Sequence, residues 1–482
     1  MTTRGEATPE RALTVEQVRE LIAAGREQPQ VNHILHGFPS VRMWPDDPVV
    51  AEQAAEEIDD WYADDTGPTD GYIGFPYCVA TDPERCGYCL FPSEVFRRSS
   101  DSVDYLDLVR AERPIWRHRA GRLTSVFVGG GTPNLLRSDQ LEQLRATIDE
   151  RFPEVDRDTV VTVEGIPQLF SEGKVAALAA IGVQRISMGA QQMDAELLAM
   201  SGRRETPEHI VSAVESAARH GMACNVDLIF GWPRQTIDSM VDGLDRLART
   251  GVDHITHYEM NVGGPSDFAL HHRHEMPDPE TLRAMYLAGV EVLVGHGYRQ
   301  LTTHDFVRDP TDGSDWLYQE SWGSTHRRTV LAAGFAGITE LYRPDMGAGF
   351  VAVNHRSLPT YRDAVGRGEP PVERWFRRSA EDVRLTALFR CLQGLEVDRR
   401  DYLDSFGTDV VDDQRALWDV LGDEGWAEVD TDRVRLGGLG AYYVPRIQSI
   451  IATHRTRELR AALRATGTTV PTASDVRLTP RR

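Results

Sequence analysis

From residue 71 to residue 258, short continuous apolar runs alternate with longer segments whose apolar residues recur at helical spacing. The runs predict strands at 71–76, 124–128, 159–164, 183–189, 223–229 and 252–258. Continuous apolar strands separated by helices are typical of a parallel sheet covered by helices. Six such units predict an α/β fold, an incomplete (β/α)6 barrel of the TIM type, with the active site at the carboxyl ends of the strands. An open, doubly wound sheet is the alternative.

The segments on either side follow other patterns. Helical spacing of apolar residues predicts helices at 15–26 and 48–60, with an extended, proline-punctuated stretch between them. After a predicted strand at 298–306, a stretch rich in glycine and aromatic residues shows no regular period. Beyond Glu369-Pro370-Pro371, helices and an alternating strand at 427–436 predict a small, winged-helix-like α+β domain.

These patterns divide the chain into four predicted parts. They are an N-terminal helical and extended region (1–68), the barrel (69–300), an irregular extension that covers the substrate (301–372) and the C-terminal domain (373–482).

Composition narrows the class of protein. The chain has 482 residues, 41% of them hydrophobic, and a net charge of −21, so it lacks the basic surface that nucleic acid or anionic lipid requires. Three of its five cysteines are clustered, which does not suit a disulfide framework and fits a reduced compartment. The N-terminus has no apolar core for a signal peptide, and no stretch is long enough to span a membrane. We expect a cytoplasmic protein with no nucleic-acid or membrane partner.

The clustered cysteines follow the first predicted strand as Cys78-x7-Cys86-x2-Cys89. Thiolates this close at a strand-to-loop transition suit a soft metal or an iron–sulfur cluster. Three ligands on a four-iron cluster leave one iron open for a small molecule. The spacing also allows two other interpretations, a chance group of structural thiols and a zinc knuckle that lacks its fourth ligand.

Polar or glycine-rich groups end the next strands in turn. Gly129, Gly130 and Gly131 precede Thr132, a pattern that lets a ligand approach the backbone and its N–H donors, or that forms an ordinary tight turn. The later strand ends and their loops contribute Glu164, Gln191, Arg203 and Asp227. Polar groups at consecutive strand ends are typical of a barrel active site.

The ordered motifs resemble the radical S-adenosylmethionine (SAM) superfamily, in its HemN-like branch of oxygen-independent coproporphyrinogen III oxidases and their relatives. The matching stretches are YIGFPYC…CGYCLF, VFVGGGTPNLL, VTVEGIP, GVQRISMGAQQMD, SGRRETPEHI, NVDLIFGWPRQT and, near the C-terminus, LFRCLQGLEVDRRDYLDSFG.

The resemblance implies a set of roles. A [4Fe–4S] cluster would bind to Cys78, Cys86 and Cys89, and one electron from a donor such as flavodoxin or ferredoxin would split SAM into methionine and a 5′-deoxyadenosyl radical. That radical would abstract hydrogen from a small-molecule substrate. The residues expected at the first SAM are Glu164, Gln191, Arg203 and Asp227, with Gly129–Thr132 beside it; Tyr72, Glu164 and Asp227 are the expected catalytic set.

Three departures from the family pattern favour a divergent relative. Seven residues instead of three separate the first two cysteines, Gly74 replaces the usual His, and Phe91 replaces a further cysteine. These differences predict an enzyme similar to class C radical SAM methyltransferases and cyclopropanases, which uses a second SAM to transfer a methyl or methylene group. The second SAM would lie against Leu228-Ile229-Phe230, under a mobile cover at 305–354. The alternatives are oxidative decarboxylation of a coproporphyrinogen-like substrate and a haem-binding or haem-trafficking protein.

The remaining candidates have simpler interpretations. Cys224 and Cys391 lie in apolar segments and are expected in the core. His254 and His257 are three apart on a predicted strand, so they should point to opposite faces and share no metal. The aromatic residues at 316, 318 and 322 fit either a substrate pocket or simple packing.

Overall fold

A crescent-shaped sheet of parallel strands forms the centre of the molecule. The computed structural model describes residues 13–28, 30, 37–44, 50–64, 69–116, 123–308, 329–343 and 347–465. Six parallel neighbours follow one another in chain order: β1 (Thr69–Phe75), β4 (Leu123–Gly130), β5 (Val160–Gly165), β6 (Arg185–Gln191), β7 (Ala223–Phe230) and β8 (His254–Glu259). They are the six predicted strands, and no end differs from its prediction by more than two residues.

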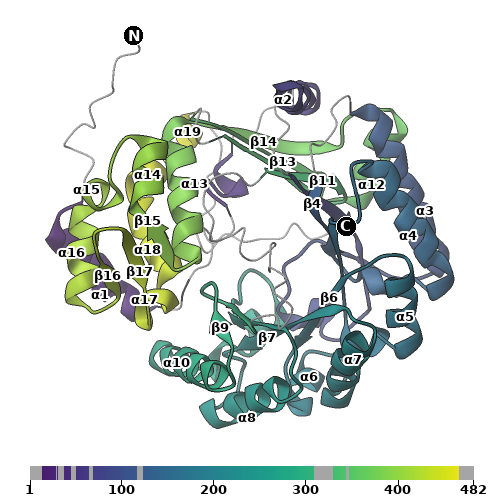
Figure 1. Ribbon diagram of the computed structural model, residues 1–482, viewed down its shortest axis with the longest axis horizontal. Helices are drawn as coiled ribbons and strands as arrows, with labels where there is room; N and C mark the ends of the chain where they lie inside the picture. The colour runs from purple at the N-terminus through teal and green to yellow at the C-terminus, as the bar shows by residue number, and fades with distance from the viewer. Residues whose placement is uncertain are drawn as a thin grey trace.

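Helices cover the convex side of this sheet, as Figure 1 shows. They are α3 (Ser99–Glu112), α4 (Leu141–Arg151), α5 (Glu172–Ala180), α6 (Ala195–Met200), α7 (Pro207–Arg219), α8 (Ile237–Ala248) and α10 (Pro279–Gly295). The strands bury one face against these helices and most of the other face inside the barrel, which explains the continuous apolar runs in the sequence. The order of strands and helices confirms the predicted α/β fold with an incomplete barrel.

Short antiparallel strands end the sheet beyond β8. The predicted strand at 298–306 is in fact two strands, β9 (Arg299–Gln300) and β10 (Asp305–Val307), which pair with each other. β10 also pairs with β8 and so brings Asp305 opposite Thr256.

The opposite edge extends the sheet on the far side of β1. There β11 (Thr329–Gly334) runs parallel to β1 and is followed by the antiparallel strands β12 (Ile338–Arg343), β13 (Ala348–Asn354) and β14 (Val372–Arg378). The helix α12 (Leu358–Gly366) connects the last two.

This edge differs from the irregular cover that was predicted for 301–372. Strand β13 is buried along almost its whole length, and a short apolar run of this kind does not by itself distinguish a strand from a buried helix. The sheet also continues through β14, past the predicted domain boundary at residue 372. The aromatic positions 316, 318 and 322 lie outside the described residues.

A smaller α+β unit follows the barrel, as predicted. It contains α13 (Ala380–Gln393), β15 (Glu396–Asp398), α14 (Arg399–Phe406), α15 (Val410–Asp413), α16 (Arg415–Asp423), β16 (Ala427–Val429), β17 (Arg433–Leu436), α17 (Leu439–Tyr442), α18 (Val444–Ile451) and α19 (Thr453–Ala465). Its three strands pair antiparallel in the order β15-β17-β16. The predicted strand at 427–436 is the β16–β17 hairpin.

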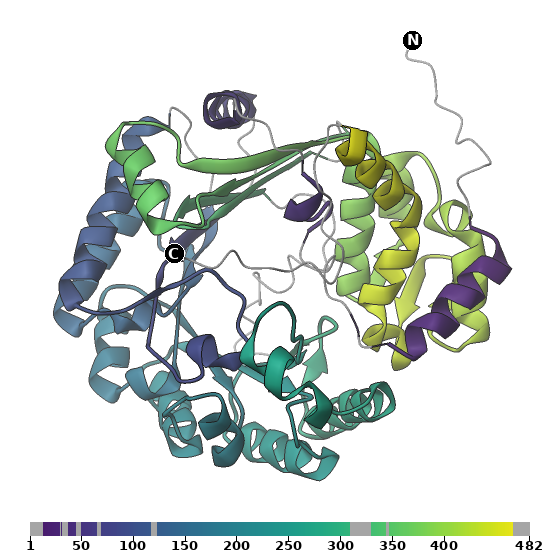
Figure 2. The same ribbon diagram turned by 180° about the vertical axis from the view of Figure 1, so that it is seen from behind.

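The N-terminal region is shared between the two parts. Helix α1 (Val15–Arg26) contacts α16 and α18, whereas α2 (Val50–Asp64) contacts β14 of the barrel sheet (Figure 2). Among the described helices, none is both long enough and apolar enough to cross a membrane.

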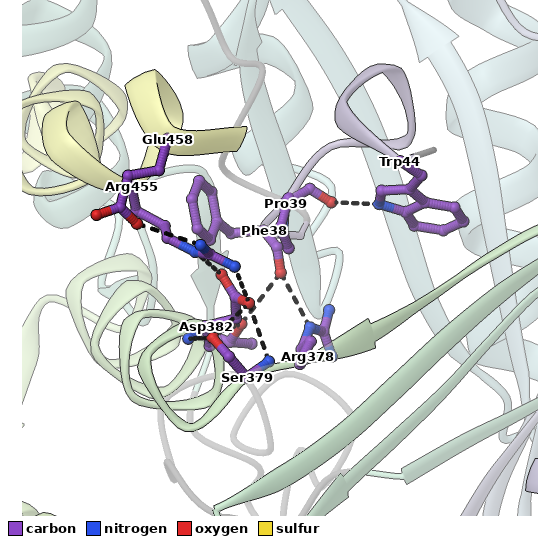
Figure 3. A network of polar contacts seen from close by, with 9 residues as sticks. Phe38, Pro39, Trp44, Arg378, Ser379, Asp382, Arg455 and Glu458 are labelled. Atoms are coloured by element: carbon purple, nitrogen blue, oxygen red, sulfur yellow. Dashed lines mark hydrogen bonds and ion pairs between the residues drawn. The ribbon is translucent and has the colours of Figure 1, made fainter. Parts of the chain in front are cut away.

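The segment Phe38–Trp44 ties these parts together, as Figure 3 shows. Arg378 of β14 donates to the carbonyl oxygen of Phe38 over 2.9 Å, and the Phe38 ring packs edge-on against Phe389 of α13. Nearby, Asp382 at the start of α13 accepts two hydrogen bonds of 2.8 Å from Arg455 of α19. The Asp382 side chain is fully buried, so this pair anchors the last helix to the domain.

We expect Asp382→Ala to lower the free energy of unfolding by about 3–5 kcal/mol, because it leaves the Arg455 guanidinium without its buried partner. Urea denaturation followed by circular dichroism measures the change. The matched control is Asp139→Ala, which removes an equally direct ion pair to Arg137 at the surface and should leave the transition almost unmoved. Equal effects of the two substitutions would contradict the anchoring role of Asp382.

Candidate active site

The three clustered cysteines lie on one compact loop beyond the carboxyl end of β1. The loop begins with β2 (Tyr77–Cys78), which pairs with β3 (Glu94–Val95), and continues into a short 3-10 turn at Glu84–Gly87. Cys78 ends β2, Cys86 lies inside the turn and Cys89 follows it.

Local hydrogen bonds fold the seven-residue connection back on itself. Cys86 N–H donates to Thr81 Oγ1 over 2.9 Å, and Cys89 N–H donates to the carbonyl oxygen of Arg85 over 3.1 Å. Arg85, Cys86 and Gly87 all have left-handed backbone angles, with φ of 55°, 57° and 74°. Such a run is costly for residues other than glycine, and it persists only where the surroundings impose it. The longer spacing between the cysteines is thus built into a defined turn.

The thiol groups are close enough to influence one another. Burial raises the pKa of Cys78, and the neighbouring Cys86 raises it further. Burial also raises the pKa of Cys89 to about 11, with Cys86 and Cys78 acting in the same direction. Cys86 therefore lies near enough to the other two thiols to disfavour their ionisation, which makes the three cysteines neighbours.

Three neighbouring thiols could hold a single ion or an iron–sulfur cluster. In the described part of the chain, no group of three His, Cys, Asp or Glu side chains is arranged to hold a single metal ion. A four-iron cluster takes one sulfur on each of several irons, so its thiolates stand further apart. Cys224 and Cys391 are each 1% exposed, which confirms their prediction as core residues.

Aromatic packing holds the cysteine loop against the barrel. The ring of Tyr88 lies 5.3 Å from Trp232, beyond the end of β7, and 5.8 Å from Phe268 of the helix α9 (Asp267–His271). A Cβ on Gly87 would lie 2.7 Å from the Phe268 ring, so only glycine fits between the two cysteines. The loop is therefore positioned from two strand ends, β1 and β7.

The glycine loop after β4 uses its N–H groups inside the protein. Successive N–H groups of residues 130–132 donate to Glu164 Oε2 (2.9 Å), to the carbonyl oxygen of Phe75 (2.8 Å) and to that of Tyr77 (2.7 Å). This differs from the expectation that they present free donors to a ligand. The Thr132 hydroxyl lies 3.5 Å from Cys78 Sγ, so the loop borders the cysteines directly.

Glu164 and Asp227 bring two buried carboxyl groups to the same region of the barrel interior. Burial raises the pKa of Glu164 to about 8; the Gly130 N–H opposes this shift, and Asp227 adds to it. Burial likewise raises the pKa of Asp227, against hydrogen bonds from Asn225 and Thr256. Both groups therefore resist ionisation until a cation or a hydrogen-bond donor reaches them.

A polar network that the sequence patterns did not reveal supports Asp227. Asn225 Nδ2 donates to Asp227 Oδ1 over 2.8 Å and to Ser187 Oγ over 3.0 Å, while its Oδ1 accepts from Thr256 Oγ1 over 3.1 Å. Burial alone would raise the pKa of Asp305, but hydrogen bonds from His254 and Thr302 hold it at about 2. The sequence feature that could have revealed this network is the occurrence of polar residues at alternate positions of three consecutive strands. These residues are Arg185 and Ser187, Asn225 and Asp227, and His254 and Thr256.

Three further predicted site residues, Tyr72, Gln191 and Arg203, lie on β1, at the end of β6 and in the turn after α6. The Tyr72 ring stacks on Phe127 of β4, with centroids 6.2 Å apart and planes within 7° of parallel. Gln191 ends β6 with φ of 69°, and its side chain folds over Gly189. The Arg203 guanidinium forms an ion pair with Glu205 and lies 3.5 Å from Cys86 Sγ, at the cysteine loop.

The structure explains Gly74 by packing. A Cβ at this position would lie 2.1 Å from the carbonyl oxygen of Phe335, because β11 runs close beside β1. The Tyr105 hydroxyl donates to the Gly74 carbonyl and accepts from Phe335 N–H over 2.7 Å, which fixes this approach. The missing histidine thus reflects strand packing and carries no information on the reaction.

The predicted apolar wall at Leu228-Ile229-Phe230 is not a continuous surface. Strand alternation places Leu228 and Phe230 on the face opposite Asp227, and Phe230 packs 4.6 Å from the His257 ring under the helices. Only Ile229 shares the inner face with Asp227. The same alternation puts His254 inside the barrel and His257 outside it, which confirms their predicted separation.

Comparison with known proteins agrees with this geometry. Residues 83–247 match the sequence pattern of the radical SAM superfamily, so Cys86 and Cys89 lie within the match and Cys78 lies just before it. This segment of the chain is thus similar to the radical SAM superfamily.

Known relatives resemble about half of the chain. The chain is 28% identical over 251 residues to the haem chaperone HemW of Haemophilus influenzae, and the matched region covers 50% of this chain and 63% of that protein. It is 30% identical over 272 residues to the mitochondrial radical S-adenosyl methionine domain-containing protein 1 of Bos taurus, spanning 53% and 60%. This chain therefore matches about three fifths of the length of these relatives. These similarities agree with the predicted resemblance to the HemN-like branch.

A solved structure shares the whole fold. Coproporphyrinogen III oxidase (HemN) from Escherichia coli superimposes with a TM-score of 0.74 at 21% identity, covering 90% of this chain and 98% of that one. The similarity extends over both the barrel and the C-terminal unit.

The Glu164 carboxyl gives a pH-dependent prediction. The unfolded chain releases this proton near pH 4.5 and the folded protein retains it up to about pH 8, so the folded form binds more protons in between. Its contribution to the free energy of unfolding must therefore fall as the pH rises from about 4.5 to about 8. We expect Glu164→Gln to flatten that decline in urea titrations of the cofactor-free protein.

The control for this titration is Glu369→Gln. Arg367 lowers the pKa of Glu369, so its substitution should leave the slope between pH 4.5 and 8 as it is in the parent. A Glu164→Gln protein with the parent's slope would show that Glu164 ionises freely.

Proposed function

We propose that this chain is a SAM-cleaving radical enzyme whose substrate is a tetrapyrrole. The observation that carries the proposal is the convergence of three thiol groups on one loop with the buried carboxyls of Glu164 and Asp227, at the carboxyl ends of parallel barrel strands. Barrel enzymes of this kind build their active sites at that end of the sheet.

The cysteines at 78, 86 and 89 would hold the [4Fe–4S] cluster, and the adjoining strand ends would hold SAM. When bound, the pair supplies one-electron cleavage to methionine and a 5′-deoxyadenosyl radical. The contribution of this chain is positioning. The Glu164 and Asp227 carboxyls can bind the ammonium and hydroxyl groups of SAM, and Asn225 fixes the orientation of Asp227.

Burial at the site serves the same chemistry. Tyr88, Trp232 and Phe268 close one side of the cysteine loop, and the Tyr72–Phe127 stack lines the interior between the first two strands. Apolar walls of this type exclude water from a reactive site. A carboxyl that becomes ionised only when cationic SAM arrives would also couple SAM binding to proton release.

The substrate class is proposed from the relatives. Curated relatives at 28–30% identity are named as haem chaperones or radical SAM domain proteins, which favours a tetrapyrrole over an unrelated small molecule. The predicted alkylation with a second SAM finds no support there. Strand packing requires Gly74, and Leu228 and Phe230 face away from the site, so neither feature favours a second SAM.

The names of those relatives also favour a second candidate, in which the chain binds haem without turning over SAM. Both candidates place a tetrapyrrole on this scaffold, and they differ in whether SAM is consumed.

The proposed cluster can be tested by its iron content and its absorbance. Anaerobically reconstituted protein should bind about one four-iron cluster per chain, and replacing Cys78, Cys86 and Cys89 by alanine should abolish its visible absorbance. Iron analysis and absorbance spectra measure this. Cys391→Ala, which removes a buried thiol from the C-terminal unit, should keep the full iron content. Undiminished iron in the triple variant would overturn the proposed site.

The substrate prediction separates the two candidates. Reduced holoenzyme with SAM and coproporphyrinogen should release carbon dioxide and form 5′-deoxyadenosine, and Asp227→Asn should weaken SAM binding while leaving the cluster spectrum intact. Titration with haem gives the contrasting result: a new Soret band with no SAM cleavage would support the haem-binding candidate. Transfer of deuterium from methyl-labelled SAM to a product would instead restore the alkylation hypothesis.

A further inference from the structure

Arg203 lies in an unusual position for a residue expected to bind SAM. All three of its guanidinium nitrogens already have protein partners: Nε pairs with Glu205, Nη2 donates to the carbonyl oxygen of Gly189, and Nη1 donates to Cys86 Sγ over 3.5 Å. The side chains of Arg203 and Glu205 are only 8% and 1% exposed. The guanidinium is therefore held by three partners in a site without solvent, and one of its N–H groups points at the sulfur of Cys86.

The contact depends on the long connection between the first two cysteines. Gly202 has φ of 71°, and a Cβ on it would lie 2.4 Å from the carbonyl oxygen of Asp82. The turn that carries Arg203 thus packs directly on the connection 79–85, which in turn carries Cys86. Thr81 fixes the Cys86 backbone from the same connection.

The charges around Arg203 are arranged to keep it cationic. Arginine is not deprotonated in proteins, and Glu205 forms an ion pair with this guanidinium inside the protein. A buried cation that donates to a ligand sulfur stabilises the more negative oxidation state of a metal centre, because hydrogen bonds and net charge near the sulfurs set its reduction potential.

We propose that Arg203 is a positioning residue for the cluster, and that its hydrogen bond to the Cys86 thiolate raises the cluster's reduction potential. The inference rests on the proposed function, since it requires a cluster on these cysteines. The step concerned is the addition of one electron from a low-potential donor of the flavodoxin or dithionite class. No covalent bond forms or breaks, and the added negative charge is the charge that Arg203 faces.

The test is a redox titration of reconstituted, SAM-free protein, followed by the electron paramagnetic resonance signal of the reduced cluster. At the parent's midpoint potential, Arg203→Gln should lower the ratio of reduced to oxidised cluster about tenfold, which corresponds to about 59 mV for one electron. The matched control is Arg204→Gln, which removes the same charge from the exposed neighbouring side chain and should shift the ratio less than twofold.

Arg203→Gln leaves the buried Glu205 carboxylate without its ion-pair partner, so a second variant controls for this effect. Arg203→Gln together with Glu205→Gln removes both charges and leaves no carboxylate unpaired, and it should retain the cluster with a ratio below that of the parent. A cluster-bearing Arg203→Gln protein with an unchanged potential but weaker SAM binding would overturn the inference and return Arg203 to a SAM-binding role. A parent protein that binds no cluster would overturn the proposed function itself.

Discussion

The site depends on a backbone contact that leaves no room for side chains. The loop 129–132 approaches the end of β1 so closely that a Cβ on Gly131 would lie 2.4 Å from the carbonyl oxygen of Tyr77. A Cβ on Gly129 would be as close to Glu164 Oε2. This contact joins three strands at one point: β1 delivers the cysteine loop, β4 delivers the glycines, and β5 delivers Glu164. Without it, the thiols and the carboxyl would not share one volume.

The same contact explains the unusual electrostatics of the interior. Glu164 is held in place by one backbone N–H, which is too little to offset its burial, so its pKa remains high. Asp227 is held by Asn225 and lies close enough to Glu164 to oppose its ionisation. Two buried carboxyls with raised pKa values are well suited to a cationic ligand, because the positive charge of the ligand favours their ionised form. Asp305, which has hydrogen bonds from His254 and Thr302, shows the contrasting case of a buried acid that stays ionised.

Much of the fold could be predicted from the sequence, because burial under helices leaves continuous apolar runs. The six barrel strands, the C-terminal hairpin and the core cysteines were all predictable on that basis. The strands between 329 and 354 were not, since β11, β12 and β13 follow one another in the described residues without the helices that separate the barrel strands. Within the site, the residue types alone identified Cys78, Glu164 and Asp227 as candidates. The reason for Gly74, which is the close approach of β11, appears only in the folded structure. The role of Asn225 was hidden for a similar reason: its partners come from neighbouring strands.

The seven-residue connection shows how a departure from a family pattern can be structural and functional together. Added loop length costs little entropy, so a longer connection can close on the same ligand positions. Here it does more than close, because its Thr81 and Asp82 contact Cys86 and the turn before Arg203. A shorter connection would lack these residues and could not provide the same contacts. The insertion therefore couples Cys86 to the turn after α6 and to the buried cation that this turn carries.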